Sequence, residues 1–153
     1  MLKVIDKDIT SIEEGLIVHQ VNCVGKMGAG VAGVLRKKYP RIYSSYASIV
    51  REYIKNGEES PILGTVNIVV INDKLSIVNA FTQYFYGYDG RQYTDYGAIT
   101  KAFSRLKLVN YKNRPIYIPF NYGCGLGGGN WKDVDSIIEK VYPEVIACRL
   151  PNS

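Results

Sequence analysis

The sequence predicts an α/β sandwich built on a mixed β-sheet. Short apolar runs bounded by turn residues alternate with longer amphipathic segments, which is the order expected of strands connected by helices. Two runs, residues 66–71 and 75–80, are separated only by Asn-Asp-Lys, which indicates a hairpin at one edge of an otherwise parallel sheet. The length of 153 residues, with 46% hydrophobic and 22% charged residues, is typical of one globular domain.

Each expected strand and helix is predicted from its own pattern of apolar and turn residues. The expected strands are residues 2–5, 16–22, 66–71, 75–80, 115–120 and 144–150, and the expected helices are residues 31–39, 42–57, 95–111 and 131–142. Residues 10–15 predict one helical turn, with Thr10 as N-cap and Glu13 as its capping-box partner. Gly57 is expected to end the second helix and Asn130 to cap the last one.

Composition and charge limit the classes of function that this protein could have. The net charge of +5 fits a polyanionic partner or simple solubility. No apolar run is long enough to cross a bilayer, and the first residues lack the apolar stretch of a signal peptide, so we expect a cytoplasmic protein without membrane contact. The cysteines, Cys23, Cys124 and Cys148, form no C-x-x-C pair, which argues against a disulfide framework and a zinc site. We expect neither a metal nor a cofactor.

The segment Gly-Ala-Gly-Val-Ala-Gly, residues 28–33, matches the dinucleotide fingerprint G-x-G-x-x-G. That fingerprint requires the helix to follow its strand directly, and a second strand ending in an acidic residue about twenty residues later. Here the expected strand ends near Asn22, well before Gly28, and the residues around position 50 have a helical pattern. The context therefore argues against a Rossmann site.

The glycines still predict an anion site. A glycine-rich turn before a helix presents free backbone N–H groups at the positive end of the helix dipole. A second glycine-rich segment, residues 121–131, also follows an expected strand and precedes a helix. Two such loops at the carboxyl ends of strands favour a ligand crevice there, and two phosphate-binding loops suggest a diphosphate.

Three motifs resemble the macrodomains, a family that binds ADP-ribose. The motifs are "KDIT" at 7–10, "IVHQVNCVGKMGAGVAGVL" at 17–35 and "NYGCGLGGGNW" at 121–131. The resemblance covers nearly the whole chain. It implies a three-layer α/β/α sandwich with a central mixed sheet, one macrodomain over residues 1–153, and ADP-ribose or an ADP-ribose derivative as the partner.

The resemblance also implies site residues. Asp8, with the backbone of Ile9, would contact the adenine, and Asn22 would contact the distal ribose. The first loop would wrap the diphosphate and ribose through Gly28, Ala29, Gly30 and Val31. The second loop would bind the diphosphate through Gly123, Cys124, Gly125, Leu126 and Gly127.

The sequences of the two loops resemble those of one branch of the family. This branch contains ADP-ribose-1''-phosphate phosphatases, terminal ADP-ribose glycohydrolases and antitoxin macrodomains that act on DNA. The resemblance implies that glycohydrolases of this branch carry a nucleophilic lysine where this chain has Gln83, and an aspartate where it has Gly127. An amide cannot form the imine that a lysine mechanism needs.

Hydrolysis of ADP-ribose-1''-phosphate to ADP-ribose and phosphate is therefore the leading hypothesis. One alternative is a hydrolase that releases ADP-ribose from protein, nucleic acid or an acetyl ester. The other is a non-catalytic module that binds ADP-ribose. Nucleic acid is expected only as an ADP-ribosylated substrate.

The catalytic candidates are Asn22 and His19. His19, the single histidine of the chain, is either a hydrogen-bonded residue within the sheet or a general acid or base at the crevice. Cys23 and Cys124 are either fillers of tight turns or chemical groups. The aromatic segment at residues 83–96 is either a lid over the distal ribose or a loop that packs on the sheet edge.

Overall fold

The structure, a computed structural model, describes residues 1–55 and 62–151. Its central element is a six-stranded sheet with the strand order β1-β6-β5-β2-β4-β3. The strands are β1 (Lys3–Asp6), β2 (Gly15–Val21), β3 (Val66–Val70), β4 (Leu75–Phe81), β5 (Ile116–Pro119) and β6 (Ile146–Arg149). All neighbouring strands are parallel except β3 and β4. The predicted mixed sheet with an edge hairpin is confirmed.

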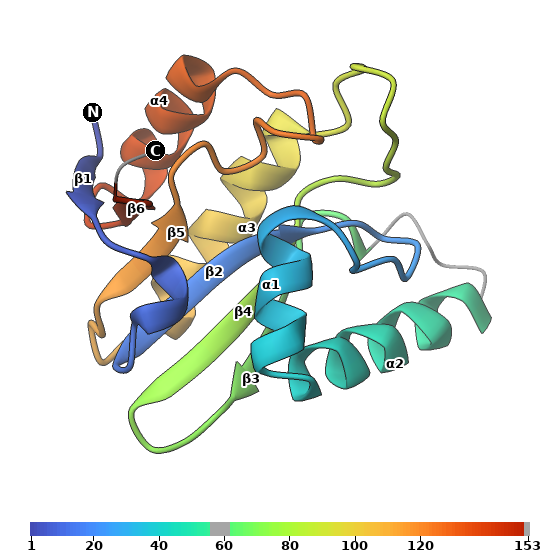
Figure 1. Cartoon of the computed structure of the whole chain (residues 1–153), viewed down its shortest axis with the longest axis horizontal. Helices are drawn as coiled ribbons and strands as arrows, with labels where there is room; N and C mark the ends of the chain where they lie inside the picture. The colour runs from blue at the N-terminus through green and yellow to red at the C-terminus, as the bar shows by residue number, and fades with distance from the viewer. Residues whose placement is uncertain (56–61, 152–153) are drawn as a thin grey trace.

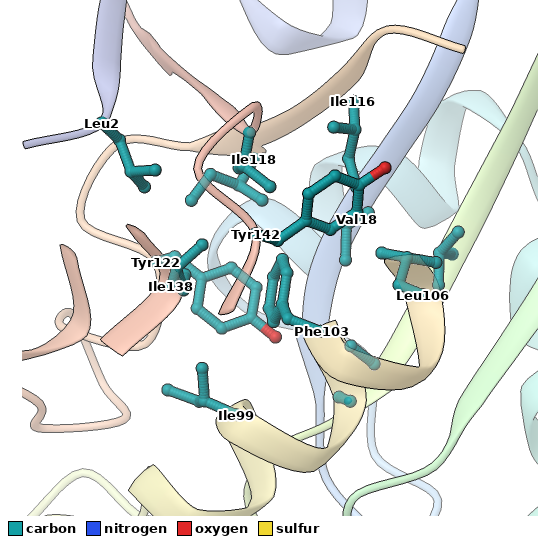
Figure 2. Packing of buried hydrophobic residues seen from close by; sticks show 14 of the residues in the cluster. Leu2, Val18, Ile99, Phe103, Leu106, Ile116, Ile118, Tyr122, Ile138 and Tyr142 are labelled. Atoms are coloured by element: carbon teal, nitrogen blue, oxygen red, sulfur yellow. The ribbon is translucent and has the colours of Figure 1, made fainter. Parts of the chain in front are cut away.

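Helices cover both faces of the sheet, so the molecule has three layers (Figure 1). The helices are α1 (Gly30–Lys38), α2 (Arg41–Lys55), α3 (Tyr96–Val109) and α4 (Trp131–Val141), with the short 3-10 helix η1 (Ile9–Ser11) after β1. One apolar cluster joins α1 and α2 to the sheet, and the other joins α3 and α4 to the opposite face (Figure 2). The predicted three-layer α/β/α sandwich is confirmed.

The alternation along β2 explains why both faces can be covered. Ile17 and Val21 pack on the α1/α2 side, whereas Leu16 and Val18 pack on the α3/α4 side, as the two-residue period of a strand requires. Because β2 is central and buried on both faces, its sequence reads as a continuous apolar run rather than an alternating one.

One local prediction is wrong. The turn after β1 is η1, and its N-cap is Asp8 rather than Thr10, because the carboxylate of Asp8 accepts a hydrogen bond from the backbone N–H of Thr10 at 2.9 Å. Because a carboxylate two residues before a free N–H group can accept from it directly, η1 does not need the predicted capping box with Glu13. The predicted cap Asn130 is confirmed, since it accepts from Lys132 N. Gly57 lies outside the described residues.

Among the described residues, no helix is long and apolar enough to cross a membrane.

Candidate functional site

A cleft runs along the carboxyl ends of the strands and consists of three adjoining hollows. Their volumes are about 570, 280 and 330 Å³, and we term them the apolar, glycine and distal hollows. Gly30 and Asn121 line both the apolar and the glycine hollow. Ala29 and Leu126 line both the glycine and the distal hollow. The three hollows therefore form a row, as an elongated ligand would require.

The apolar hollow is bordered by Asp8 and Ile9, and also by Val34 of α1, Phe120 and Arg149. The Oδ1 atom of Asp8 accepts from the N–H of Thr10 at 2.9 Å and from its hydroxyl at 2.8 Å. The first of these bonds is the main reason that the pKa of Asp8 lies below its usual value. Asp8 is therefore an ionised acceptor at the rim of an apolar hollow, which suits a flat base with an amino donor.

The glycine hollow lies between the two glycine loops. Ala29, the N-cap of α1, makes no side-chain hydrogen bond to the helix, and the N–H groups of Gly30, Val31 and Ala32 donate to no other described group. Free amides at a helix N-terminus bind anions. In the second loop the N–H groups of Gly125 and Leu126 are likewise without a partner among the described residues. The hollow can therefore offer amides from both sides.

The glycines of the loops fall into two groups. A Cβ atom added at Gly28, Gly30 or Gly125 would meet nothing within 4 Å. By contrast, a Cβ atom at Gly127 would lie 2.4 Å from the hydroxyl oxygen of Thr94. The first group faces open space where a ligand could lie, and Gly127 is required for packing.

The distal hollow contains Asn22, which is buried directly after β2. Its Oδ1 accepts from the hydroxyl of Tyr46 at 2.6 Å and from Val24 N at 3.1 Å, and its Nδ2 donates to Lys26 O at 2.7 Å. Tyr46 is fully buried, and burial raises the pKa of its hydroxyl. The side chain of Asn22 therefore fixes the first loop and retains one free amide hydrogen.

His19 lies beneath the glycine hollow and is 1% exposed. Its Nε2 is 2.6 Å from Oδ1 of Asn79, whose Nδ2 already donates to Ile42 O and to Asn67 Oδ1. Because both amide hydrogens are used, Oδ1 must accept, so Nε2 carries the proton and Nδ1 is a bare acceptor. Burial lowers the pKa of His19 to about 4. At neutral pH this imidazole is uncharged and hydrogen-bonded within the sheet.

The thiols lie in apolar surroundings. Burial raises the pKa of Cys23 to about 12 and that of Cys124 to about 11, which disfavours the reactive thiolate. Cys124 lines none of the three hollows, and its Sγ donates to Tyr122 O at 3.3 Å. Its position favours the turn-filling alternative.

The segment at residues 83–96 lies partly at the cleft and partly against the second loop. Tyr86, Gly87 and Tyr88 line the distal hollow. Further along, the N–H groups of Tyr93 and Thr94 both donate to Gly127 O, at 2.7 and 3.0 Å. One part of the segment therefore borders the cleft, and the other part is attached to the second loop.

Sequence reasoning missed several residues of the cleft, among them one cation of the first loop and a pair at the ends of β5 and β6. Lys26 lines the distal hollow, and Phe120 and Arg149 line the apolar hollow. Lys26 lies within the quoted first loop, so its position was a usable signal. Phe120 and Arg149 come together only because β5 and β6 are neighbours in the sheet.

Comparisons with known proteins bear on the fold of this chain. No family model matches the chain. A solved structure, the macrodomain of Mycobacterium tuberculosis DarG, superposes with a TM-score of 0.74 at 25% identity and covers 100% of this chain and 99% of its own. This chain therefore has the macrodomain fold. A Thermosipho africanus DarTG structure in complex with ADP-ribose also shares the fold, with a TM-score of 0.72 at 19% identity, over 97% of this chain and 41% of its own.

Curated proteins to which this chain is similar include hydrolases. A DNA ADP-ribosyl glycohydrolase of Mycobacterium bovis is 26% identical over 95% of the chain, which spans about two fifths (41%) of that relative's length. An ADP-ribose 1''-phosphate phosphatase of Aspergillus oryzae is 34% identical over 34% of the chain and 26% of its own length.

Proposed function

We propose that this macrodomain binds ADP-ribose and hydrolyses ADP-ribose-1''-phosphate to ADP-ribose and inorganic phosphate. The observation that carries the proposal is the order of the three hollows. An apolar hollow with a carboxylate, a hollow with free amides and a polar hollow with Asn22 follow one another. Adenosine, diphosphate and distal ribose follow one another in the ligand.

Each hollow would contribute one kind of interaction. Asp8 would accept from the adenine amino group, and the amides near Gly30 and Gly125 would hold the diphosphate. The free amide hydrogen of Asn22 would donate to the distal ribose. This arrangement would fix the ribose C1'' in the distal hollow, where the phosphate ester would be exposed to water.

The proposed chemistry breaks the phosphorus–oxygen bond by attack of water, which leaves a hydroxyl group on C1''. Positioning and stabilisation of developing negative charge dominate such reactions. Asn22 remains our candidate for positioning. His19 would act, if at all, as an acceptor through its bare Nδ1, because a group with a pKa of about 4 does not donate a proton near neutral pH.

The surroundings of Gln83 favour this reaction over a lysine mechanism. The Oε1 of Gln83 accepts from Gln20 Nε2 at 2.6 Å, and its Nε2 donates to Phe85 O at 2.7 Å. Both ends of the amide are thus engaged in holding the segment at residues 83–96. Gln83 supplies no nucleophile and no proton at C1''.

A second candidate function is the release of ADP-ribose from nucleic acid. Tyr88, which is 72% exposed, lines the distal hollow, and Phe85, which is 51% exposed, packs against the ring of Tyr86, another residue of that hollow. Exposed aromatic rings stack well on bases. The similarity to a DNA ADP-ribosyl glycohydrolase over 95% of the chain supports the same candidate.

One panel assay separates these functions. Purified protein is incubated with ADP-ribose-1''-phosphate, ADP-ribosylated protein, ADP-ribosylated oligonucleotide and O-acetyl-ADP-ribose, and we expect phosphate release from the first. Asn22→Asp keeps the acceptor for Tyr46 but removes the amide donor, so turnover should fall by about tenfold or more. ADP-ribose binding without turnover of any substrate would leave the binding-module alternative, and release from the oligonucleotide alone would favour the second candidate.

A further inference from the structure

The distal hollow contains a cation that the proposed binding of ADP-ribose does not use. Of the described residues that line this hollow, Lys26 alone carries a charge. Its side chain is exposed, and its ammonium group makes no ion pair or hydrogen bond within residues 1–55 and 62–151. A free charge therefore borders the hollow.

The backbone of Lys26 is fixed although its side chain is free. Lys26 N donates to Asn22 Oδ1 at 3.3 Å, and Lys26 O accepts from Asn22 Nδ2 at 2.7 Å. The same Oδ1 is held by the hydroxyl of the buried Tyr46. The lysine stem therefore starts from a defined point beside the proposed ribose contact, and its long side chain can follow a ligand without moving the loop.

The electrostatic surroundings favour an anion in this hollow. Among the residues that the structure describes, no acidic side chain lines it. The nearby segment at residues 83–96 carries Asp89, but this carboxylate is engaged by Arg91 at 3.3 Å and by the hydroxyl of Tyr93 at 2.8 Å. The uncapped N-terminus of α1 reaches the hollow through Ala29 and Ala32, and its dipole adds positive potential.

We infer that Lys26 recognises the phosphate group carried on C1'' of the distal ribose and so selects ADP-ribose-1''-phosphate over ADP-ribose. This inference rests on the proposed function, because it assigns the distal hollow to that ribose. The diphosphate is common to both compounds, so only the additional phosphate distinguishes them. ADP-ribose, the organic product, lacks this contact and should therefore bind less tightly than the substrate.

The test compares Lys26→Gln and Lys26→Arg with Lys37→Gln, a control that removes the same charge from an exposed position of α1 outside the distal hollow. For Lys26→Gln we expect KM for ADP-ribose-1''-phosphate to rise by about fivefold to tenfold, as for a partly exposed ionic hydrogen bond. The affinity for ADP-ribose should stay within about twofold of wild type by calorimetry, because ADP-ribose lacks the contacted phosphate. Lys26→Arg should restore KM, and added salt should reduce the difference.

Three outcomes would overturn the inference. An equal loss for both ligands in Lys26→Gln would mean that Lys26 only shapes the loop. An unchanged KM would mean that the ammonium does not reach the phosphate. Borohydride trapping of an ADP-ribose adduct on Lys26 would make it a nucleophile instead.

If the protein does not hydrolyse ADP-ribose-1''-phosphate, the inference about Lys26 can still be tested separately. If wild type binds ADP-ribose but releases no phosphate, calorimetry with ADP-ribose-1''-phosphate still tests Lys26. Tighter binding of the phosphorylated ligand by wild type, lost in Lys26→Gln, would support the inference without any catalysis. Equal affinities for the two ligands in wild type would refute it.

Discussion

The two glycine loops look alike in sequence but are built differently. The first loop is held from inside, because the buried side chain of Asn22 accepts from Tyr46 and spans to Lys26. The second loop is held from outside, because Gly127 O accepts from two N–H groups of the segment at residues 83–96, and Gly123 O accepts from the hydroxyl of Thr94. The internal support of the first loop leaves the amides at the start of α1 free, whereas external support occupies much of the second loop's surface.

The glycines show what this difference means. Gly28 and Gly30 in the first loop face open space, but in the second loop only Gly125 among residues 123–129 does so. At Gly128 a Cβ atom would lie 2.3 Å from Arg91 O. A glycine-rich loop can therefore serve a ligand or the close approach of another backbone, and the residue type alone does not distinguish the two.

The largest effect is expected from a substitution that removes the proposed contact between the second loop and the diphosphate. Gly125→Glu should fold normally, because its φ is not positive and the added side chain enters open space. It should weaken ADP-ribose binding by about a hundredfold or more, since a carboxylate would lie beside the phosphates and like charges cost several kcal/mol. Calorimetry with a parallel thermal melt measures both properties. Normal binding would place the diphosphate elsewhere.

A smaller effect should distinguish the glycines that face open space from those that pack against other residues. Gly127→Ala should lower the free energy of unfolding by roughly 1–3 kcal/mol, the usual cost of overpacking, because its Cβ would lie 2.8 Å from Gly123 O as well as against Thr94. Gly125→Ala is the matched control and should leave that free energy unchanged or slightly higher. Urea unfolding of both variants is the measurement, and equal values would remove the distinction.

The smallest effect concerns the internal support of the first loop. Tyr46→Phe removes the hydroxyl that contacts Asn22 and Gly25 but keeps the ring stacked on Phe81. We expect a loss of about 1–2 kcal/mol in stability, because Asn22 Oδ1 loses its buried donor, and weaker ADP-ribose binding through the loosened loop. Tyr43→Phe, on the same helix, is the control. If Tyr46→Phe bound ADP-ribose as wild type does, the first loop would not depend on this support.

Much of the fold could be predicted because it depends on local patterns. The run at 16–22 became β2, and the hairpin at 66–80 became β3 and β4, since strand periodicity and a short turn act within a few residues. The cap at Asp8 was missed because Thr10 and Asp8 are both good caps, and backbone geometry decides between them. Sequence could not show that the Lys26 ammonium would have no partner among the described residues, because that depends on which charges the fold places nearby.

By itself, the sequence determined the layers of the sandwich, the two loops after β2 and β5, and the resemblance that points to ADP-ribose. These could be determined because hydrophobic periodicity and the positions of glycines are local features of the sequence. Tertiary structure alone decided the rest. It placed Asn79 against His19, so that burial and a fixed proton leave the imidazole neutral. It placed Thr94 against Gly127 and left Gly125 open. Burial and contact between residues far apart in sequence set which side chains are free to meet a ligand.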